Sequence, residues 1–262
     1  MPNEIPEHSA KNFTELLSQL EKFQKKTKVS WSRGMRAAKY HLEPSLYRHP
    51  KLKKIEDLLS TERQITTRFV QRSLPYLSRR LVGDWDKLFL MQHYGVPTRL
   101  LDWTENPMVS AYFALQNDVK HKDDDAVIWL CDPEKWNQSA FRHISYKGGV
   151  FDEDDDNIAK HKPGTPLAEM PDTPIMMFGS YNSPRIVAQR GVFALFGKSM
   201  SPMDEFFKAS DYEAGCLEKI IVPAAKVDLV RESLFRKGFT ESVVFPEIEG
   251  LAKELRRENG YE

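Results

Sequence analysis

The order of the helical and strand-like segments limits the fold of this chain more than any other feature. Apolar side chains recur at three- and four-residue spacing over residues 12–27 and again over 55–81, a pattern typical of amphipathic helices. Short β-rich segments at 29–34, 125–130 and 219–223 alternate with further helical patterns. Helices first, and then strands mixed with helices, predict an α+β fold rather than a doubly wound parallel sheet.

Turn and cap residues set the expected ends of several other segments. Pro75 should kink or end the second helix, and Asp84 can cap the next one. Asn106 before Pro107 predicts a further helix start, because proline at the first helical position costs no hydrogen bond. The expected later segments are a weakly ordered surface excursion at 152–174, a bent strand or a bulged hairpin at 185–196, a strand at 242–245 and a C-terminal helix at 247–257.

Composition and charge exclude several classes of protein. The 262 residues include 38 Lys or Arg and 38 Asp or Glu, so the chain lacks the overall basic charge of a dedicated nucleic-acid binder, although local basic patches stay open. There is no apolar run of about 18 residues and no N-terminal secretion signal, which predicts a cytoplasmic protein without a membrane partner. Cys131 and Cys216 stand far apart without metal-ligand spacing, so we expect reduced thiols and no metal site.

Basic side chains are concentrated on the second helical segment. The arginines of this segment are Arg63, Arg68, Arg72, Arg79 and Arg80. They could bind phosphate groups, or they could form the solvated helix face that runs of charge usually form.

The segment from residue 92 to 114, QHYGVPTRLLDWTENPMVSAYFA, holds an unusual density of polar side chains between apolar and turn-forming residues. Asp102 and Thr104 are expected near a helix entrance, whose backbone N–H groups favour an anion. We therefore expect the functional centre of the protein here. Asp102 could instead pair with Arg99 in a buried network that only specifies the fold.

Motifs spread between residues 31 and 252 together resemble one family. Ser32-Arg33-Gly34 stands where that family has Phe-Arg-Gly, and QHYGVPTRLLDWTENP is the central match. Further matches are Tyr40, Leu42, Pro44-Ser45-Leu46, Arg48, Ala111-Tyr112-Phe113-Ala114, Arg185, Ala188-Gln189, Gly191, Phe193, Phe245-Pro246-Glu247 and Gly250-Leu251-Ala252. Through these motifs the chain resembles the FRG domain family. The resemblance implies a helical N-terminal segment at 1–28 and an FRG domain at 29–262.

The order of the motifs is similar to that of ADP-ribosyltransferases, including toxins that modify DNA. In such enzymes an arginine ends an early strand, aromatic residues follow, and a catalytic acid stands on a later strand. The resemblance implies an α+β, ADP-ribosyltransferase-like mixed β core that takes NAD as a substrate. It also implies a mono-ADP-ribosyltransferase that modifies nucleic acid or protein as a toxin or anti-phage defence effector, with an antitoxin or other protein as partner.

The chemistry of NAD cleavage assigns a role to each candidate residue. The nicotinamide–ribose bond breaks through an oxocarbenium-like state, which needs a polar group at the ribose, an aromatic ring at the nicotinamide and a cation at the pyrophosphate. The resemblance implies that Arg33 binds the pyrophosphate, Tyr112 or Tyr94 the ring, and Gln189 the ribose. The base would be His93, Asp102 or Glu247. The other residues expected to bind the nucleotide are Gly34, Arg99, Trp103, Thr104 and Asn106.

Each candidate also has a structural interpretation. Arg33 could form a buried ion pair, and Tyr112 could belong to the core. His93 could be a satisfied structural histidine, and Glu247 could place negative charge at a helix N-terminus. Gln189 is neutral where a catalytic acid is expected, so the main alternative is a domain that recognises a nucleotide or nucleic acid without turning it over.

Overall fold

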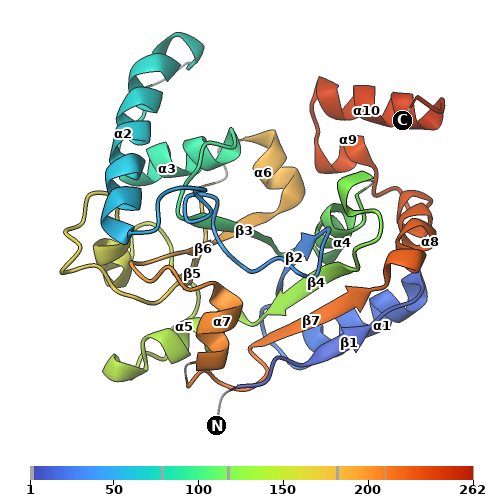
Figure 1. Cartoon of the computed structure of the whole chain (residues 1–262), viewed down its shortest axis with the longest axis horizontal. Coiled ribbons are helices and arrows are strands. Elements are labelled where there is room, and N and C mark those ends of the chain that lie inside the picture. The colour runs from blue at the N-terminus through green and yellow to red at the C-terminus, as the bar shows by residue number, and fades with distance from the viewer. Residues whose placement is uncertain (1–2, 78–79, 117–118, 181–182, 210, 262) are drawn as a thin grey trace.

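The chain folds around one mixed β-sheet that carries helices on both faces (Figure 1). The structure is a computed structural model that describes residues 3–77, 80–116, 119–180, 183–209 and 211–261. Seven strands are ordered β1-β7-β4-β2-β3-β6-β5. The outer pair β1 and β7 is parallel, whereas the other neighbouring strands are antiparallel. This arrangement confirms the predicted α+β class.

The strands and helices alternate along most of the chain. The strands are β1 (Glu7–Ser9), β2 (Trp31–Met35), β3 (Leu100–Thr104), β4 (Ala126–Cys131), β5 (Ile175–Met177), β6 (Gly191–Leu195) and β7 (Leu217–Val222). The α-helices are α1 (Phe13–Gln24), α2 (Ile55–Ser73), α3 (Asp84–His93), α4 (Pro107–Ala114), α5 (Pro133–Ala140), α6 (Pro184–Gln189), α7 (Met203–Ala209), α8 (Ala224–Phe235), α9 (Glu241–Val244) and α10 (Ile248–Glu258). Short 3₁₀ helices cover Leu74–Tyr76, Val119–His121, Arg142–Ile144 and Asp156–His161. No helix in the described ranges has the length and apolarity needed to cross a bilayer.

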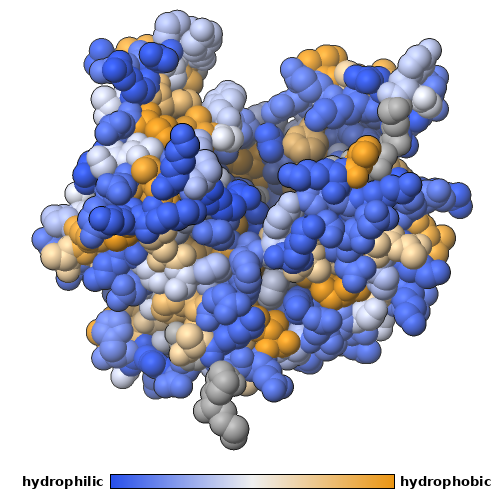
Figure 2. Space-filling view, in the orientation of Figure 1, coloured by the Kyte–Doolittle hydropathy of each residue, from blue (hydrophilic) through white to orange (hydrophobic). Residues whose placement is uncertain are grey.

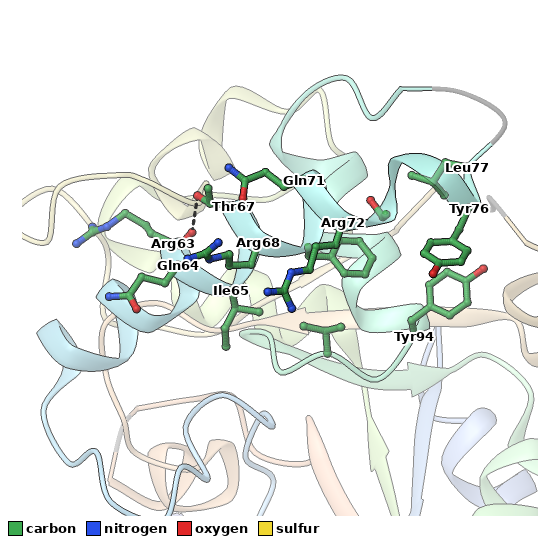
Figure 3. Close-up of a pocket in the computed structure, with 13 residues that line it drawn as sticks. Arg63, Gln64, Ile65, Thr67, Arg68, Gln71, Arg72, Tyr76, Leu77 and Tyr94 are labelled. Carbon is green, nitrogen blue, oxygen red and sulfur yellow. Dashed lines mark hydrogen bonds between the residues drawn. The ribbon is translucent and has the colours of Figure 1, made fainter.

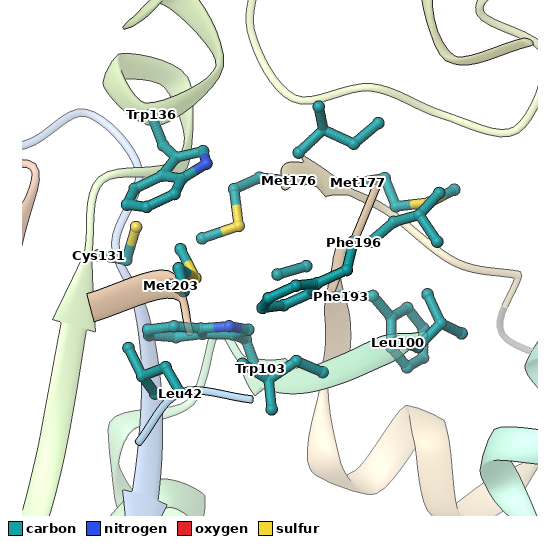
Figure 4. Packing of buried hydrophobic residues seen from close by; sticks show 14 of the residues in the cluster. Leu42, Leu100, Trp103, Cys131, Trp136, Met176, Met177, Phe193, Phe196 and Met203 are labelled. Carbon is teal, nitrogen blue, oxygen red and sulfur yellow. The ribbon is translucent and has the colours of Figure 1, made fainter. Parts of the chain in front are cut away.

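Two hydrophobic clusters hold the helices to the sheet. The larger cluster contains Trp103, Trp136, Phe193 and Phe196, whose side chains interleave with buried methionines (Figure 4). The second cluster joins α1, α4 and α8 to the inner residues of β4 and β7. All six residues of β4 are buried, as its apolar sequence predicts for a strand covered on both faces.

The N-terminal segment belongs to the same sheet as the rest of the chain. β1 pairs with β7 in parallel, and this short strand was not expected from the sequence. The predicted first helix is confirmed as α1, where Asn12 caps the helix by accepting a hydrogen bond from the Glu15 backbone N–H. The boundary placed at residue 28 stays a prediction.

The bent strand predicted at 185–196 is wrong in its first half. The residues Arg185–Gln189 belong to α6 because Ser183 caps the Ile186 N–H and Pro184 occupies the first helical position. Arg190 then ends the helix with a left-handed backbone (φ 45°), and β6 begins at Gly191. The helix cap at Ser183 therefore outweighed the β propensity of the residues that follow it.

Three smaller expectations also need correction. The strand predicted at 242–245 is wrong, because α9 covers most of that segment. Gly83, not Asp84, occupies the N-cap of α3, which has no side-chain cap. The excursion at 152–174 is tied to the core by buried Ile158, His161 and Met170. Pro75 does end α2, in a 3₁₀ turn, while Arg79 lies outside the described residues.

Candidate functional site

A polar cleft opens where β2 and β3 meet α3, α4 and α6. It consists of two adjoining hollows of about 280 and 670 Å³. Both are lined by Arg33, Gln92, His93, Asp102 and Arg185. Figure 2 shows the molecule hollowed between the projecting α2 and α10, beside α3 and α6. Small-molecule sites have volumes of about 300–1,000 Å³, so the joined hollows offer room for a nucleotide.

Arg33 lies on β2, which is held in register between β3 and β4. Its Nη1 donates to the Asp102 backbone oxygen at 2.5 Å, whereas its Nε is buried and has no hydrogen-bond partner among the described residues. Burial lowers the pKa of Arg33 against the opposing effect of the Asp102 carboxylate, and Arg48 lowers it further. A bound anion would supply both the missing acceptor and the missing negative charge.

Asp102 is exposed on β3 between the buried residues Leu101 and Trp103. Its Oδ2 accepts a hydrogen bond from Gln92 Nε2 at 2.8 Å, and Gln92 Oε1 in turn accepts one from the Thr98 hydroxyl. Gln92 therefore orients the carboxylate without neutralising it. This leaves a negative charge directly beside Arg33 in the cleft.

His93 lies at the end of α3 and meets the groups around the outer hollow. Its Nδ1 is 3.3 Å from Ser183 Oγ, and its ring contacts Tyr94 edge-on with 4.7 Å between the centroids. Burial lowers the pKa of His93, Arg185 lowers it further, and Glu247 opposes both. The imidazole is therefore neutral at pH 7 and able to accept a proton.

Gln189 and Glu247 lie at different ends of the cleft. Gln189 is the last residue of α6, not a strand residue as the family resemblance implied, and it lines the inner hollow. Its Nε2 donates to the Val244 backbone oxygen at 3.1 Å. Glu247 lines the outer hollow at the N-cap of α10, where its exposed carboxylate makes no cap hydrogen bond.

Three predicted nucleotide-binding residues do not line the cleft, namely Tyr112, Arg99 and Asn106. Tyr112 is 3% exposed in the second hydrophobic cluster, where its ring packs against Phe235 and Phe245. Burial raises its pKa to about 12. Arg99 is fully buried in an ion pair with Glu62. The core interpretation is therefore correct for Tyr112, and the predicted Arg99–Asp102 pair is replaced by an Arg99–Glu62 pair.

Gly34, Trp103 and Thr104 line the inner hollow in structural roles, whereas Asn106 lines neither hollow. A Cβ at Gly34 would lie 1.7 Å from the Ser110 backbone oxygen, so glycine lets α4 lie directly on β2. Thr104 donates from its hydroxyl to the Gln189 backbone oxygen at 2.6 Å. Asn106 caps α4 as predicted, and the Trp103 side chain is buried in the larger cluster.

Sequence reasoning assigned no role to three polar residues that line the cleft, namely Gln92, Arg48 and Arg185. All three stand in the motifs that carry the family resemblance. The Arg185 guanidinium lies over the Phe245 ring at 4.8 Å, which joins α6 to the segment before α10. Their position inside the motifs could have marked them as candidate site residues. The sequence alone, however, does not show which motif residues line the same cleft.

One group in the described part of the chain has ligand atoms close enough for a metal ion, and it consists of His41, Asp204 and Glu205. Asp204 already accepts hydrogen bonds from the Leu42 N–H and from His41 Nδ1, both at 2.8 Å. Glu205 pairs with Lys208 at 2.9 Å. These contacts hold α7 against the segment after β2, and they account for the proximity of the three side chains without a metal ion.

The fold and cleft together define an α+β protein with an arginine-lined polar site. Residues 28–123 match the family model of the FRG domain, which supports the FRG family for this part of the chain. The matched segment contains Arg33, Gln92, His93 and Asp102, while Gln189 and Glu247 lie beyond it. Comparison with curated proteins and with solved structures gave no match.

Proposed function

We propose that the cleft binds NAD and transfers its ADP-ribose group to a nucleic acid or a protein. The observation that carries the proposal is the convergence of Arg33, His93 and Asp102 on both adjoining hollows. These residues supply a cation for the pyrophosphate, a base for the acceptor and a negative charge beside the ribose. We expect the protein to act as a toxin or a defence protein whose activity is restrained by a partner protein.

Arg33 is the pyrophosphate-binding group in this proposal. Its buried Nε lacks a partner among the described residues, and Arg48 and Arg185 line the same outer hollow. A pyrophosphate would accept hydrogen bonds from guanidinium groups that otherwise repel one another. Tyr94, which is 65% exposed at the rim, replaces the buried Tyr112 as the ring that covers nicotinamide.

The transfer step uses the two remaining groups. The bond between ribose C1′ and the nicotinamide nitrogen breaks, and its electron pair leaves with nicotinamide. Asp102 stabilises the positive charge that develops on the ribose. A lone pair of the acceptor forms the new bond to C1′, and the neutral His93 takes the acceptor proton with Glu247 nearby.

The test is nicotinamide release from labelled NAD, measured with and without DNA, RNA and cell lysate. Arg33→Ala should abolish NAD binding and release, while the matched control Arg236→Ala removes an exposed arginine at the C-cap of α8 and should change neither. Folding of both variants is checked by thermal unfolding. If folded wild-type protein neither binds NAD nor releases nicotinamide under these conditions, the proposal fails.

A second candidate function is recognition of a nucleotide without turnover. It is favoured by Gln189, whose amide donates to Val244 and which has no charge to offer the ribose. Calorimetric NAD binding with no nicotinamide release, unchanged in Gln189→Glu, would support recognition. Release that increases in Gln189→Glu would support the transferase instead.

A further inference from the structure

We propose that the groove along α2 binds a single strand of nucleic acid and leads it into the cleft. Binding of a strand by the groove depends only on the lining of the groove. The role of the bound strand as acceptor of ADP-ribose rests on the proposed function. The groove has a volume of about 1350 Å³ between α2, the 3₁₀ turn after it and the loop after α3 (Figure 3). It shares no lining residue with the inner hollow of the cleft and shares Tyr94 and Val96 with the outer hollow.

The groove has a strongly basic lining. Arg63, Arg68 and Arg72 line it from α2, all three are exposed, and no acidic residue lines it within the described chain. None of the three guanidinium groups is in an ion pair with another described residue. A chain of zero net charge therefore presents one local surface with the sign that attracts a phosphate backbone.

Aromatic rings accompany these charges. Tyr76 is 86% exposed and Tyr94 is 65% exposed, and both rings line the end of the groove beyond Arg72 (Figure 3). Phe69 and Ile65 add apolar surface to the same lining. Cationic side chains that follow a backbone, interleaved with rings on which bases stack, are the combination that binds single strands without sequence preference.

The rings favour a single strand over a duplex. In a duplex the base faces are stacked on one another and cannot reach a tyrosine, whereas the bases of a single strand are free to stack. An acidic peptide would use the arginines but leave both rings without a partner. The phosphate and base chemistry is common to DNA and RNA, so the experiment compares the two.

Tyr94 joins the groove to the cleft. It lines the groove together with Val96, and both residues also line the outer hollow with Arg33 and His93. A strand seated on α2 would therefore reach the hollow at the side where His93 can take a proton from an acceptor group. Binding of a small nucleotide would not require the groove, since the cleft alone is large enough to hold one.

The direct test is fluorescence anisotropy of a labelled twelve-nucleotide DNA strand, the matching RNA strand, its DNA duplex and a polyglutamate peptide, titrated over a range of salt. Both single strands should bind more tightly than the duplex and the peptide. Arg68→Ala and Arg72→Ala should each lower the slope of log K against log salt by about 0.7. Tyr76→Ala should weaken binding about tenfold through one lost base stack.

Matched controls are Arg236→Ala at the C-cap of α8 and Tyr261→Ala beyond α10, which remove an exposed arginine and an exposed tyrosine elsewhere and should not change affinity. Thermal unfolding verifies that each variant is folded. Tighter binding of duplex or peptide, or equal loss in groove and control variants, would overturn the proposal.

Labelled NAD is then added to the bound strand. Label on the strand supports both proposals. Nicotinamide release with label only on proteins retains the proposed function but overturns the strand as acceptor. Strand binding that depends on the groove, with no nicotinamide release, retains the groove and overturns the transferase.

Discussion

Arg33 lies on β2 and Arg99 directly precedes β3, but the two guanidinium groups are in opposite chemical situations. Arg99 is fully buried, and its Nε donates to both Glu62 carboxylate oxygens at 2.9 and 3.1 Å. Its other nitrogens donate to the backbone oxygens of Phe196 and His161 at 3.0 and 3.1 Å. Arg33 makes one backbone hydrogen bond and retains a buried donor without a partner in the described chain.

The hydrogen bonds of Arg99 are completed within the fold, whereas Arg33 has a donor that is available to a ligand. Burial alone would lower the pKa of Arg99, but Glu62 raises it above its ordinary value, whereas the pKa of Arg33 is lowered. A satisfied buried charge contributes to the folded state, and an unsatisfied one at a cleft carries a cost that a ligand can remove. The motifs that carry the family resemblance therefore contain both kinds of residue.

Removal of Glu62 should give the largest loss of stability. Glu62→Ala leaves the Arg99 guanidinium buried without its partner, so the free energy of unfolding should fall by about 3–5 kcal/mol in denaturant titrations. Glu56→Ala, an exposed change on the same helix, should cost under about 1 kcal/mol. Replacing both partners, Glu62→Leu with Arg99→Met, should restore much of the loss. A stable Glu62→Ala protein would contradict this account of Arg99.

Acid should destabilise the Arg99 region through His161. Burial lowers the pKa of His161 to about 4, with Arg99 adding to the effect. The unfolded state takes up a proton near its ordinary pKa of about 6.5, so stability is complete above pH 6.5 and is lost as the pH falls toward 4. The loss should approach about 3 kcal/mol. His161→Gln should flatten this pH dependence in thermal unfolding, whereas exposed His143→Gln should leave it unchanged.

Gly34→Ala should test whether the glycine beside Arg33 serves the fold. The added Cβ would lie 1.7 Å from the Ser110 oxygen and 2.7 Å from the Ala114 nitrogen, both backbone atoms of α4. We expect a loss of about 1–3 kcal/mol, typical of overpacking. Gly149→Ala is the control, since its Cβ would meet only the Glu134 side chain at 3.4 Å. Equal stability of the two variants would remove the packing explanation.

The smallest effect on stability is expected for Asp102→Asn. Asp102 is exposed and its amide analogue preserves the shape, so unfolding should change by less than about 0.5 kcal/mol. Nicotinamide release should nevertheless fall about a hundredfold, because the charge that stabilises the ribose is gone. Exposed Asp123→Asn should affect neither measurement. Full activity in Asp102→Asn would place Asp102 with Arg99 among residues that serve only the fold.

Strong periodic patterns and caps predicted much of the fold. α1, α4 and β4 follow directly from apolar spacing, from Asn caps and from an uninterrupted apolar run. At 185–196 and 242–245, β-branched residues occur in short helices. Ser183 caps α6, whereas α9 has no side-chain cap and packs against α6 and α10. Neither strand β1 nor β5, each of three residues, carries enough alternation to be recognised.

The sequence predicted which residues belong to the candidate site better than it predicted how these residues are arranged. The central motif located Asp102 and His93, and Arg33 followed from the family resemblance. Tyr112 and Tyr94 were both predicted as candidate rings, and the sequence did not decide between them. The structure does, because the apolar face of α4 buries Tyr112 and the end of α3 exposes Tyr94. The partner of Arg99 is 37 residues away in sequence, a separation that local patterns do not register.

The short strand β1 has a consequence for handling the protein. It covers one edge of β7, whose sequence LEKIIV is typical of strands that associate edge to edge when their backbone groups are unpaired. The Glu7–Lys219 ion pair at 2.7 Å then gives the new outer edge a charged border. A shortened chain that begins after residue 9 would present β7 directly to other molecules, and its failure to stay monodisperse would reflect a lost cover and not a damaged cleft.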